Sequence, residues 1–333
     1  MCGHATIALG RFLVDTQDVN VFPKCKDLLE RLDTEKKSIV VKIHAPCGIV
    51  RVTVPVLFES LDVKQLHVTS DPSRPVSFLS VPSFAVVTDF ELVIPPELRW
   101  PELFRGLNTC ENNKCTLHLD IAFGGAFYAV VLAKELGFPG EEGTVCYNRD
   151  TLKALDLATA RVKGLLMDQM PKLLKRFHGI VANDLQFLYG VTVVDECRRD
   201  LSIMSTKQVK GQDRNLCFFA GQQLDRSPTG SCVSARVALG MTKKEMNFGE
   251  TWAYHSIVSE VDRGDGSSEP FLGSAYERVL LGPRGIRKNV GSQVAKGDEI
   301  EAFVVEVDGH AWYTGVETFV LEKKDSIGRG FLI

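Results

Sequence analysis

Apolar and polar residues alternate along much of the chain, with the period of a half-buried β-strand. The alternation is strongest over residues 38–58, where the turn residues Pro46-Cys47-Gly48 interrupt it. A period of two on both sides of such a turn predicts a β-hairpin. Further strands are expected at residues 66–69, 76–81, 84–94, 116–122, 123–132, 186–194, 216–220, 255–261, 275–281, 300–307 and 312–321.

Helical patterns are fewer and shorter. Residues 1–15 and 233–241 are rich in small and apolar residues, and residues 25–36 form a charged amphipathic stretch. A longer helix is expected after Asp150, which can cap its first turn. Polar loops are expected at residues 97–114 and 208–214. Many strands, with one apolar helix in each half of the chain, predict an α+β fold.

One stretch, Asp225-Arg226-Ser227-Pro228-Thr229-Gly230-Ser231-Cys232, lies between the expected strand 216–220 and the expected helix 233–241. Proline suits the first helical positions because its missing N–H costs nothing there. Thr229, Gly230 and Ser231 are then expected to present unpaired backbone N–H groups at the positive end of the helix dipole. Such a helix end can bind an anion, for example a carboxylate.

The start of the chain repeats this design. Met1-Cys2-Gly3-His4-Ala5 opens a helix of small residues, and Cys2-Gly3-His4 aligns with Thr229-Gly230-Ser231. In each case a side chain of the nucleophile type precedes a glycine. The alignment predicts two helix N-termini of the same kind.

These two stretches resemble the two signatures of the proline racemase family. The motif Phe123-Gly124-Gly125-Ala126-Phe127-Tyr128-Ala129 resembles that family's FGG-aromatic motif, and the end of the chain, from Gly309-His310-Ala311-Trp312 to Leu332, is also similar. In the family's racemases and epimerases both signatures carry cysteine, whereas threonine at the second position marks trans-3-hydroxy-L-proline dehydratases. With Cys2 and Thr229, the chain resembles the dehydratase branch.

The resemblance implies a fold of two similar domains, diaminopimelate epimerase-like, each a curled sheet or half-barrel around a central helix. We expect residues 1–115 plus 312–333 to form the first domain and residues 116–311 the second. In the family, strands precede the first signature, so we expect the first domain to be incomplete at its start. The first central helix should then expose apolar surface. A homodimer is also implied.

The same resemblance assigns roles to single residues. Cys2, at a helix N-terminus where the dipole favours a thiolate, is expected to remove the α-proton of the substrate. The peptide N–H groups of Gly3, His4, Gly230 and Ser231 should clamp the substrate carboxylate. His4 is expected to contact the ring nitrogen or the carboxylate, Asp225 to pair with the ring ammonium, and Phe219 to stack on the ring. A turn-forming Asp225 and a core Phe219 are the structural alternatives.

Thr229 decides between reactions because inversion at the α-carbon requires a proton carrier on each face. An alcohol is too weak an acid to alternate with a thiol, so we expect one-base chemistry. The prediction is dehydration of trans-3-hydroxy-L-proline to Δ1-pyrroline-2-carboxylate, without a metal or another cofactor. Three alternatives stay open: a proline racemase or hydroxyproline epimerase, a truncated non-catalytic homologue, and a hydrolase that uses Cys2 as its N-terminal nucleophile.

Composition bears on the partners and the cellular location of the protein. A net charge of −3 over 333 residues argues against a nucleic-acid partner, and no apolar run is long enough for a transmembrane helix. The N-terminus has no basic leader, so no signal peptide is expected. The nine cysteines include no C-x-x-C pair or zinc-site spacing. Reduced thiols in a cytoplasmic protein are therefore predicted.

Overall fold

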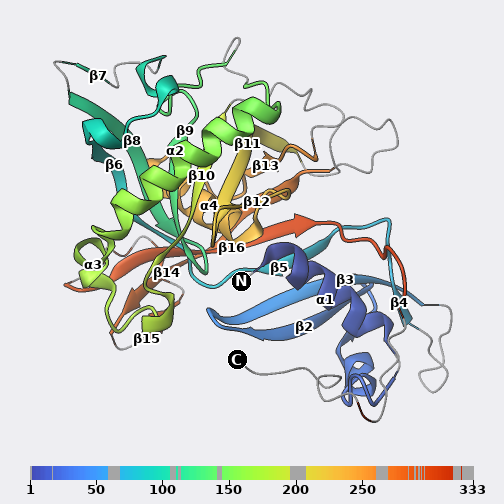
Figure 1. Cartoon of the computed structure of the whole chain (residues 1–333). Coiled ribbons are helices and arrows are strands. Elements are labelled where there is room, and N and C mark those ends of the chain that lie inside the picture. The colour runs from blue at the N-terminus through green and yellow to red at the C-terminus, as the bar shows by residue number, and fades with distance from the viewer. Residues whose placement is uncertain are drawn as a thin grey trace.

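The computed structural model describes residues 2–16, 18–58, 68–105, 110–111, 114–140, 145–195, 208–259, 269–283, 285–288, 290–291, 293, 295, 297–317 and 324. These residues form an α+β fold, as predicted (Figure 1). The strands join one open mixed sheet with the order β1-β2-β3-β5-β16-β14-β13-β11-β10-β9-β8-β6. Among the described residues, no helix is long and apolar enough to cross a membrane.

The N-terminal part of the chain combines one helix with the predicted hairpin. Its elements are α1 (Gly3–Asp15), a 3-10 helix (Lys26–Arg31), β1 (Leu32–Asp33), β2 (Ser38–Ala45), β3 (Gly48–Phe58), β4 (Val68–Ser70) and β5 (Val76–Leu79). The hairpin β2–β3 turns at Pro46-Cys47 as expected, whereas the helix predicted at 25–36 is only a 3-10 turn that leads into β1.

The buried face of α1 packs against β3, where Gly10 allows a close approach. A Cβ atom on Gly10 would lie 2.6 Å from Val52 Cγ1. On the opposite face, Leu9 and Phe12 are 41% and 40% exposed. The expected exposure of apolar surface on this helix is therefore confirmed.

The rest of the chain, from β6 to β16, supplies the larger part of the sheet, which we call its longer arm. Its elements are β6 (Phe84–Ile94), β7 (Cys110–Glu111), β8 (Lys114–Phe123), β9 (Phe127–Leu132), α2 (Arg149–Met167), α3 (Met170–Leu173), β10 (Leu188–Asp195), β11 (Val209–Phe219), β12 (Gln223–Asp225), α4 (Gly230–Lys243), β13 (Thr251–His255), β14 (Phe271–Gly282), β15 (Gly285–Arg287) and β16 (Ile300–Gly309). Short 3-10 helices lie at Pro96–Leu98, Pro101–Arg105, Lys175–Phe177 and Asn183–Leu185.

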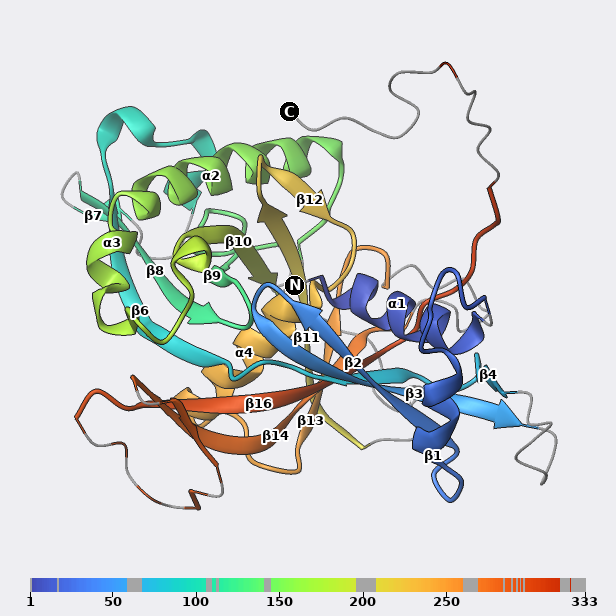
Figure 2. The same cartoon turned by 90° about the horizontal axis from the view of Figure 1, so that it is seen from below.

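Helix α4 is the centre of this arm (Figure 2). Its residues from Gly230 to Ala235 are all buried, and it contacts β16, β14, β6 and β8. A helix that is small and apolar on all sides is expected to be enclosed in this way. Strand β16 pairs with both β14 and β5, and it thereby joins the longer arm to the N-terminal hairpin.

Several expected boundaries are wrong. Residues 209–214 of the predicted loop 208–214 belong to β11, where Asp213 forms an ion pair with Arg236 of α4. Of the strand expected at 255–261, residue 255 ends β13, residues 256–259 form a turn, and residues 260–261 lie outside the described residues. Helix α2 is capped by Asn148 rather than Asp150. The strand expected at 312–321 is irregular as far as residue 317, and residues 318–321 lie outside the described residues.

Two further expectations concern cysteines and domains. Cys110 and Cys115 form a disulfide between β7 and β8, which contradicts the prediction that the thiols are reduced. Their separation of five residues gave no sequence signal, but the register of the two strands places them opposite each other.

The division into domains at residues 115 and 116 stays a prediction. From residue 318 on, the segment 312–333 lies outside the described residues, apart from residue 324.

Candidate active site

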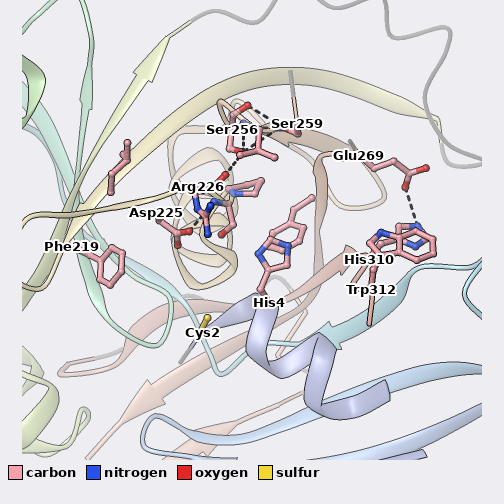
Figure 3. Close-up of a pocket in the computed structure, with 15 residues that line it drawn as sticks. Cys2, His4, Phe219, Asp225, Arg226, Ser256, Ser259, Glu269, His310 and Trp312 are labelled. Atoms are coloured by element: carbon pink, nitrogen blue, oxygen red, sulfur yellow. Dashed lines mark hydrogen bonds and ion pairs between the residues drawn. The ribbon is translucent and has the colours of Figure 1, made fainter. Parts of the chain in front are cut away.

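A cavity of about 580 Å³ lies where the N-terminus of α1 meets the turn between β12 and α4 (Figure 3). The turn after β13, the start of β14 and the residues that follow β16 complete its wall. The lining residues are Cys2, His4, Phe219, Leu224, Asp225, Arg226, Ser227, Pro228, Ser256, Val258, Ser259, Glu269, Phe271, His310 and Trp312.

Four of the eight predicted site residues line this cavity: Cys2, His4, Phe219 and Asp225. The other four are Gly3, Thr229, Gly230 and Ser231, which are buried directly beside them at the two helix N-termini. The structure therefore brings together both sequence motifs, although they stand more than 200 residues apart.

Two helix N-termini meet at this point. Cys2 is the N-cap residue of α1, and Thr229 is the N-cap residue of α4. The first intrahelical hydrogen bonds are donated by Thr6 N–H to the Cys2 carbonyl (3.0 Å) and by Val233 N–H to the Thr229 carbonyl (2.9 Å). The earlier N–H groups of both helices have no partner within the helix. Two positive dipole ends thus converge, which favours a bound anion.

The turn before α4 holds the Asp225 carboxylate by both oxygens. Ser227 N–H donates to Asp225 Oδ1 (2.8 Å), and Thr229 Oγ1 donates to Asp225 Oδ2 (2.9 Å). Thr229 N–H donates to Ser227 Oγ (3.0 Å), so the expectation that this N–H is unpaired is wrong. Pro228 precedes the N-cap instead of occupying the first helical position, because the turn ends at Thr229.

Thr229 has a left-handed backbone conformation, with φ 60° and ψ 84°. For a β-branched residue such a conformation is an outlier, with a cost of about 1–3 kcal/mol. Residues of this kind persist where their surroundings fix them, and they concentrate at functional sites. Thr229 is 7% exposed and is fixed here by the two hydrogen bonds that it donates within the turn.

His4 projects from the first turn of α1 into the cavity. Its ring packs against Phe271 of β14, with 4.5 Å between the ring centroids. Burial lowers the pKa of His4, and the nearby negative charge of Asp225 opposes this effect. The neutral imidazole is therefore favoured at neutral pH, in which form one ring nitrogen donates and the other accepts a hydrogen bond.

The FGG motif packs against the first turn of α4. Gly124 lies against the Ser231 carbonyl oxygen, at a separation that leaves no space for a Cβ atom. Tyr128, in the same motif, hydrogen-bonds to Ser231 Oγ (2.7 Å), so the Ser231 side chain contacts the core and not the cavity. The motif thus fixes the position of the Gly230 and Ser231 N–H groups.

A row of aromatic rings connects the cavity wall to Tyr128 of this motif. The Phe219 ring stacks on the Tyr189 ring at 5.5 Å, and Tyr189 packs edge-on against Tyr128 at 5.8 Å. Phe219 is partly exposed and lines the cavity, so it combines the packing role and the cavity-lining role that the sequence left open.

The thiols near the site differ in environment. Cys2 is exposed at the cavity, whereas Cys217 of β11 and Cys232 of α4 are buried. Burial raises the pKa of Cys232 to about 11, and it raises the pKa of Cys217 further. Both buried thiols are therefore protonated at neutral pH, and Cys2 is the cysteine of the described cavity wall that is available as a base. Among the described residues, no group of three His, Cys, Asp or Glu is placed to hold a metal ion.

The sequence did not predict the far wall of the cavity. Glu269 Oε2 accepts a hydrogen bond from His310 Nε2 (2.9 Å), which lowers the pKa of Glu269, and the His310 ring stacks on Trp312. Ser256 Oγ donates to the Arg226 carbonyl (2.7 Å) and thereby ties the turn after β13 to the turn before α4. His310 and Trp312 belong to the motif Gly309-His310-Ala311-Trp312, but nothing local in the sequence indicates that they line the site.

Known proteins of one family are similar to this chain. The profile of the family described as "Proline racemase" matches residues 108–332. Trans-3-hydroxy-L-proline dehydratase of Homo sapiens is 31% identical over 335 residues, an alignment that covers all of this chain and 71% of the human protein. Proline racemase of Acetoanaerobium sticklandii is 26% identical over 333 residues and is covered to 73%.

A solved structure shows the same fold. The crystal structure of a hydroxyproline epimerase from Agrobacterium vitis, with bound trans-4-OH-L-proline, superposes with a TM-score of 0.58 over all of this chain and 70% of that chain. The two sequences are 17% identical, so this likeness concerns the fold alone.

Proposed function

The chain belongs to the proline racemase family, and from this premise we propose that it dehydrates trans-3-hydroxy-L-proline to Δ1-pyrroline-2-carboxylate without a cofactor. The observation that carries the proposal is the asymmetry of the two facing helix N-termini. One N-cap residue is a thiol, Cys2, and the other is a hydroxyl, Thr229. One face of a bound imino acid would therefore meet a base, and the other face would not.

Binding would use the groups that converge on the cavity. The substrate carboxylate would accept hydrogen bonds from the N–H groups of Gly3, His4, Gly230 and Ser231. These donors are fixed before the substrate arrives, so they can stabilise the negative charge that develops beside the carboxylate without reorganisation. Asp225 would accept a hydrogen bond from the ring ammonium, and Phe219 would cover the ring.

The reaction would then be a syn elimination. In trans-3-hydroxy-L-proline, the hydroxyl and the α-hydrogen are on the same face of the ring. The Cys2 thiolate takes the α-proton, the bond between C3 and oxygen breaks, and Cys2 returns the proton to the departing hydroxide as water leaves. The enamine that remains tautomerises to Δ1-pyrroline-2-carboxylate. Cys2 ends as the thiolate with which it began.

Racemisation or epimerisation is the competing function within the family. It requires a second acid on the opposite face, where this chain has Thr229. Since an alcohol is a much weaker acid than a thiol, we expect inversion to be absent. Production of D-proline from L-proline by the wild-type protein would contradict the one-base reaction.

Proton NMR in D2O tests the proposal. Purified protein with trans-3-hydroxy-L-proline should consume the substrate and produce Δ1-pyrroline-2-carboxylate, and Cys2→Ser should abolish this turnover. Absence of both turnover and α-hydrogen exchange would refute the proposed reaction. Thermal stabilisation of the same protein by pyrrole-2-carboxylate, a planar mimic of the deprotonated substrate, would then distinguish a binding-competent pocket from one that does not bind.

A further inference from the structure

Asp225, Ser227 and Thr229 form a closed ring of three hydrogen bonds. Ser227 N–H donates to Asp225 Oδ1 (2.8 Å), Thr229 N–H donates to Ser227 Oγ (3.0 Å), and Thr229 Oγ1 donates to Asp225 Oδ2 (2.9 Å). We infer that Thr229 is a positioning residue whose hydroxyl orients the Asp225 carboxylate toward the ring ammonium of the substrate. The inference rests on the proposed function, in which Asp225 is the partner of that ammonium.

The direction of these bonds separates positioning from proton transfer. A threonine hydroxyl has one proton to donate, and here that proton is directed to Asp225. It is not directed to the substrate, and Thr229 does not line the cavity, whereas Asp225 does. A carboxylate can accept about four hydrogen bonds. Asp225 therefore keeps acceptor capacity for a ligand after each of its oxygens has accepted one bond from the turn.

The backbone of Thr229 supports the same conclusion. Its φ of 60° is disfavoured for a β-branched side chain, and a glycine or an asparagine would adopt this conformation with less strain. The hydroxyl contact with Asp225 compensates for this strain. Thr229 is thus held by its two hydrogen bonds within the turn, and the carboxylate that it contacts lines the cavity.

Two substitutions at Thr229 test this role. Thr229→Val preserves the shape of the side chain and removes the hydroxyl, whereas Thr229→Ser keeps the hydroxyl. We expect Thr229→Val to weaken calorimetric binding of L-proline about tenfold, the size of effect expected for one hydrogen bond to a charged group. Binding of pyrrole-2-carboxylate, whose ring nitrogen is neutral, should weaken less than about threefold. Thr229→Ser should restore most of the affinity for L-proline.

A double-mutant cycle with Asp225→Asn shows whether Thr229 acts through Asp225. Once the carboxylate is replaced by an amide, Thr229→Val should have little further effect on L-proline binding. Thr192→Val is the matched control, because it removes a buried hydroxyl that contacts Cys232 and not Asp225. It should leave the ratio of the two affinities unchanged. Urea unfolding of each variant identifies any that fails to fold, in which case Thr229→Ser and Asp225→Asn carry the test.

Three results would overturn the inference. Equal weakening of both ligands by Thr229→Val would show a general structural role, and additive effects in the cycle would show that Thr229 does not act through Asp225. A fall in kcat for dehydration with unchanged binding of L-proline would place Thr229 in the chemical step. These binding measurements do not need turnover. A wild-type protein that binds L-proline but does not dehydrate hydroxyproline would refute the proposed function and leave the positioning result interpretable.

Discussion

Gly3 and Gly230 face each other at the junction of α1 and α4. A Cβ atom on Gly3 would lie 2.6 Å from the Cα atom of Gly230, and one on Gly230 would lie 2.8 Å from the Cα atom of Gly3. The two helix N-termini can approach this closely only because both residues lack a side chain. The junction therefore fixes the distance between the two sets of N–H groups that we propose as the carboxylate clamp.

Gly3→Ala is expected to separate the two helix ends, because the clash is with backbone atoms and not with a flexible side chain. Overpacking of this kind costs about 1–3 kcal/mol of stability. We expect dehydratase activity to fall by more than this loss of stability explains, since the carboxylate clamp is displaced. Activity at a temperature where the variant is fully folded, together with urea unfolding, separates the two effects.

Gly164→Ala is the matched control for that substitution. Gly164 lies in α2, and a Cβ atom there meets nothing within 4 Å. Alanine in a helix interior is more stable than glycine by about 0.5–1 kcal/mol, so this variant should be slightly stabilised and fully active. Wild-type activity in Gly3→Ala would show that the spacing of the two helix ends does not matter for the reaction.

Thiol labelling is expected to distinguish Cys2 from the other cysteines near the site. Cys2 and Cys146 are exposed, whereas Cys217 and Cys232 are buried and their raised pKa values keep them as thiols. Iodoacetamide should therefore modify Cys2 and Cys146 in the folded protein and leave the two buried thiols unmodified.

Pyrrole-2-carboxylate should protect Cys2 from this modification and leave Cys146, which does not line the cavity, as the internal control. Peptide mass spectrometry measures both sites in one sample. Equal labelling of Cys2 with and without the ligand would argue against a ligand bound at the α1 N-terminus.

The sequence was most informative where local signals determine the structure. The strand Phe84–Ile94 was predicted to the residue, because alternation marks it and Pro95 ends it. The start of β11 was missed because Asp213, which looks like a loop residue, is paired with Arg236 across a tertiary contact. No local pattern reports such a partner. The turn Ser256–Ser259 was missed for a related reason, since side-chain hydrogen bonds within it end β13.

In the site, too, residues marked by a local sequence signal were predicted, and residues placed by tertiary contacts were not. The two signatures and the strand before the second one predicted Cys2, His4, Phe219 and Asp225, and all four line the cavity. The opposite wall depends on the sheet: β14 carries Phe271 to His4, and the pairing of β16 with β14 brings His310 to Glu269. Periodicity identifies such strands but not their neighbours, so these residues could not be assigned to the site from the sequence.

Thr229→Cys is expected to add inversion at the α-carbon to the activities of the protein. The substitution places a second thiol at the N-terminus of α4, opposite Cys2, where the helix dipole favours a thiolate. A thiol is a weak hydrogen-bond donor, so the contact with Asp225 should weaken and the KM should rise. Chiral chromatography of L-proline incubated with the variant should detect D-proline, with Thr229→Ser as the control that lacks a second thiol. Absence of D-proline in the presence of intact substrate binding would contradict this two-base geometry.

The stability of the protein is expected to depend on His4 as the pH falls. Burial lowers the pKa of His4 in the folded state below its ordinary value of 6.5. The unfolded chain therefore binds this proton at a higher pH than the folded protein does, and protonation favours unfolding. The free energy of unfolding should thus decrease from about pH 7.5 to about pH 5.5, the range in which histidine titrates. His4→Gln should show a smaller decrease than the wild type. Urea unfolding across this range measures the difference, and an identical pH dependence in wild type and His4→Gln would show that the imidazole is not held neutral by burial.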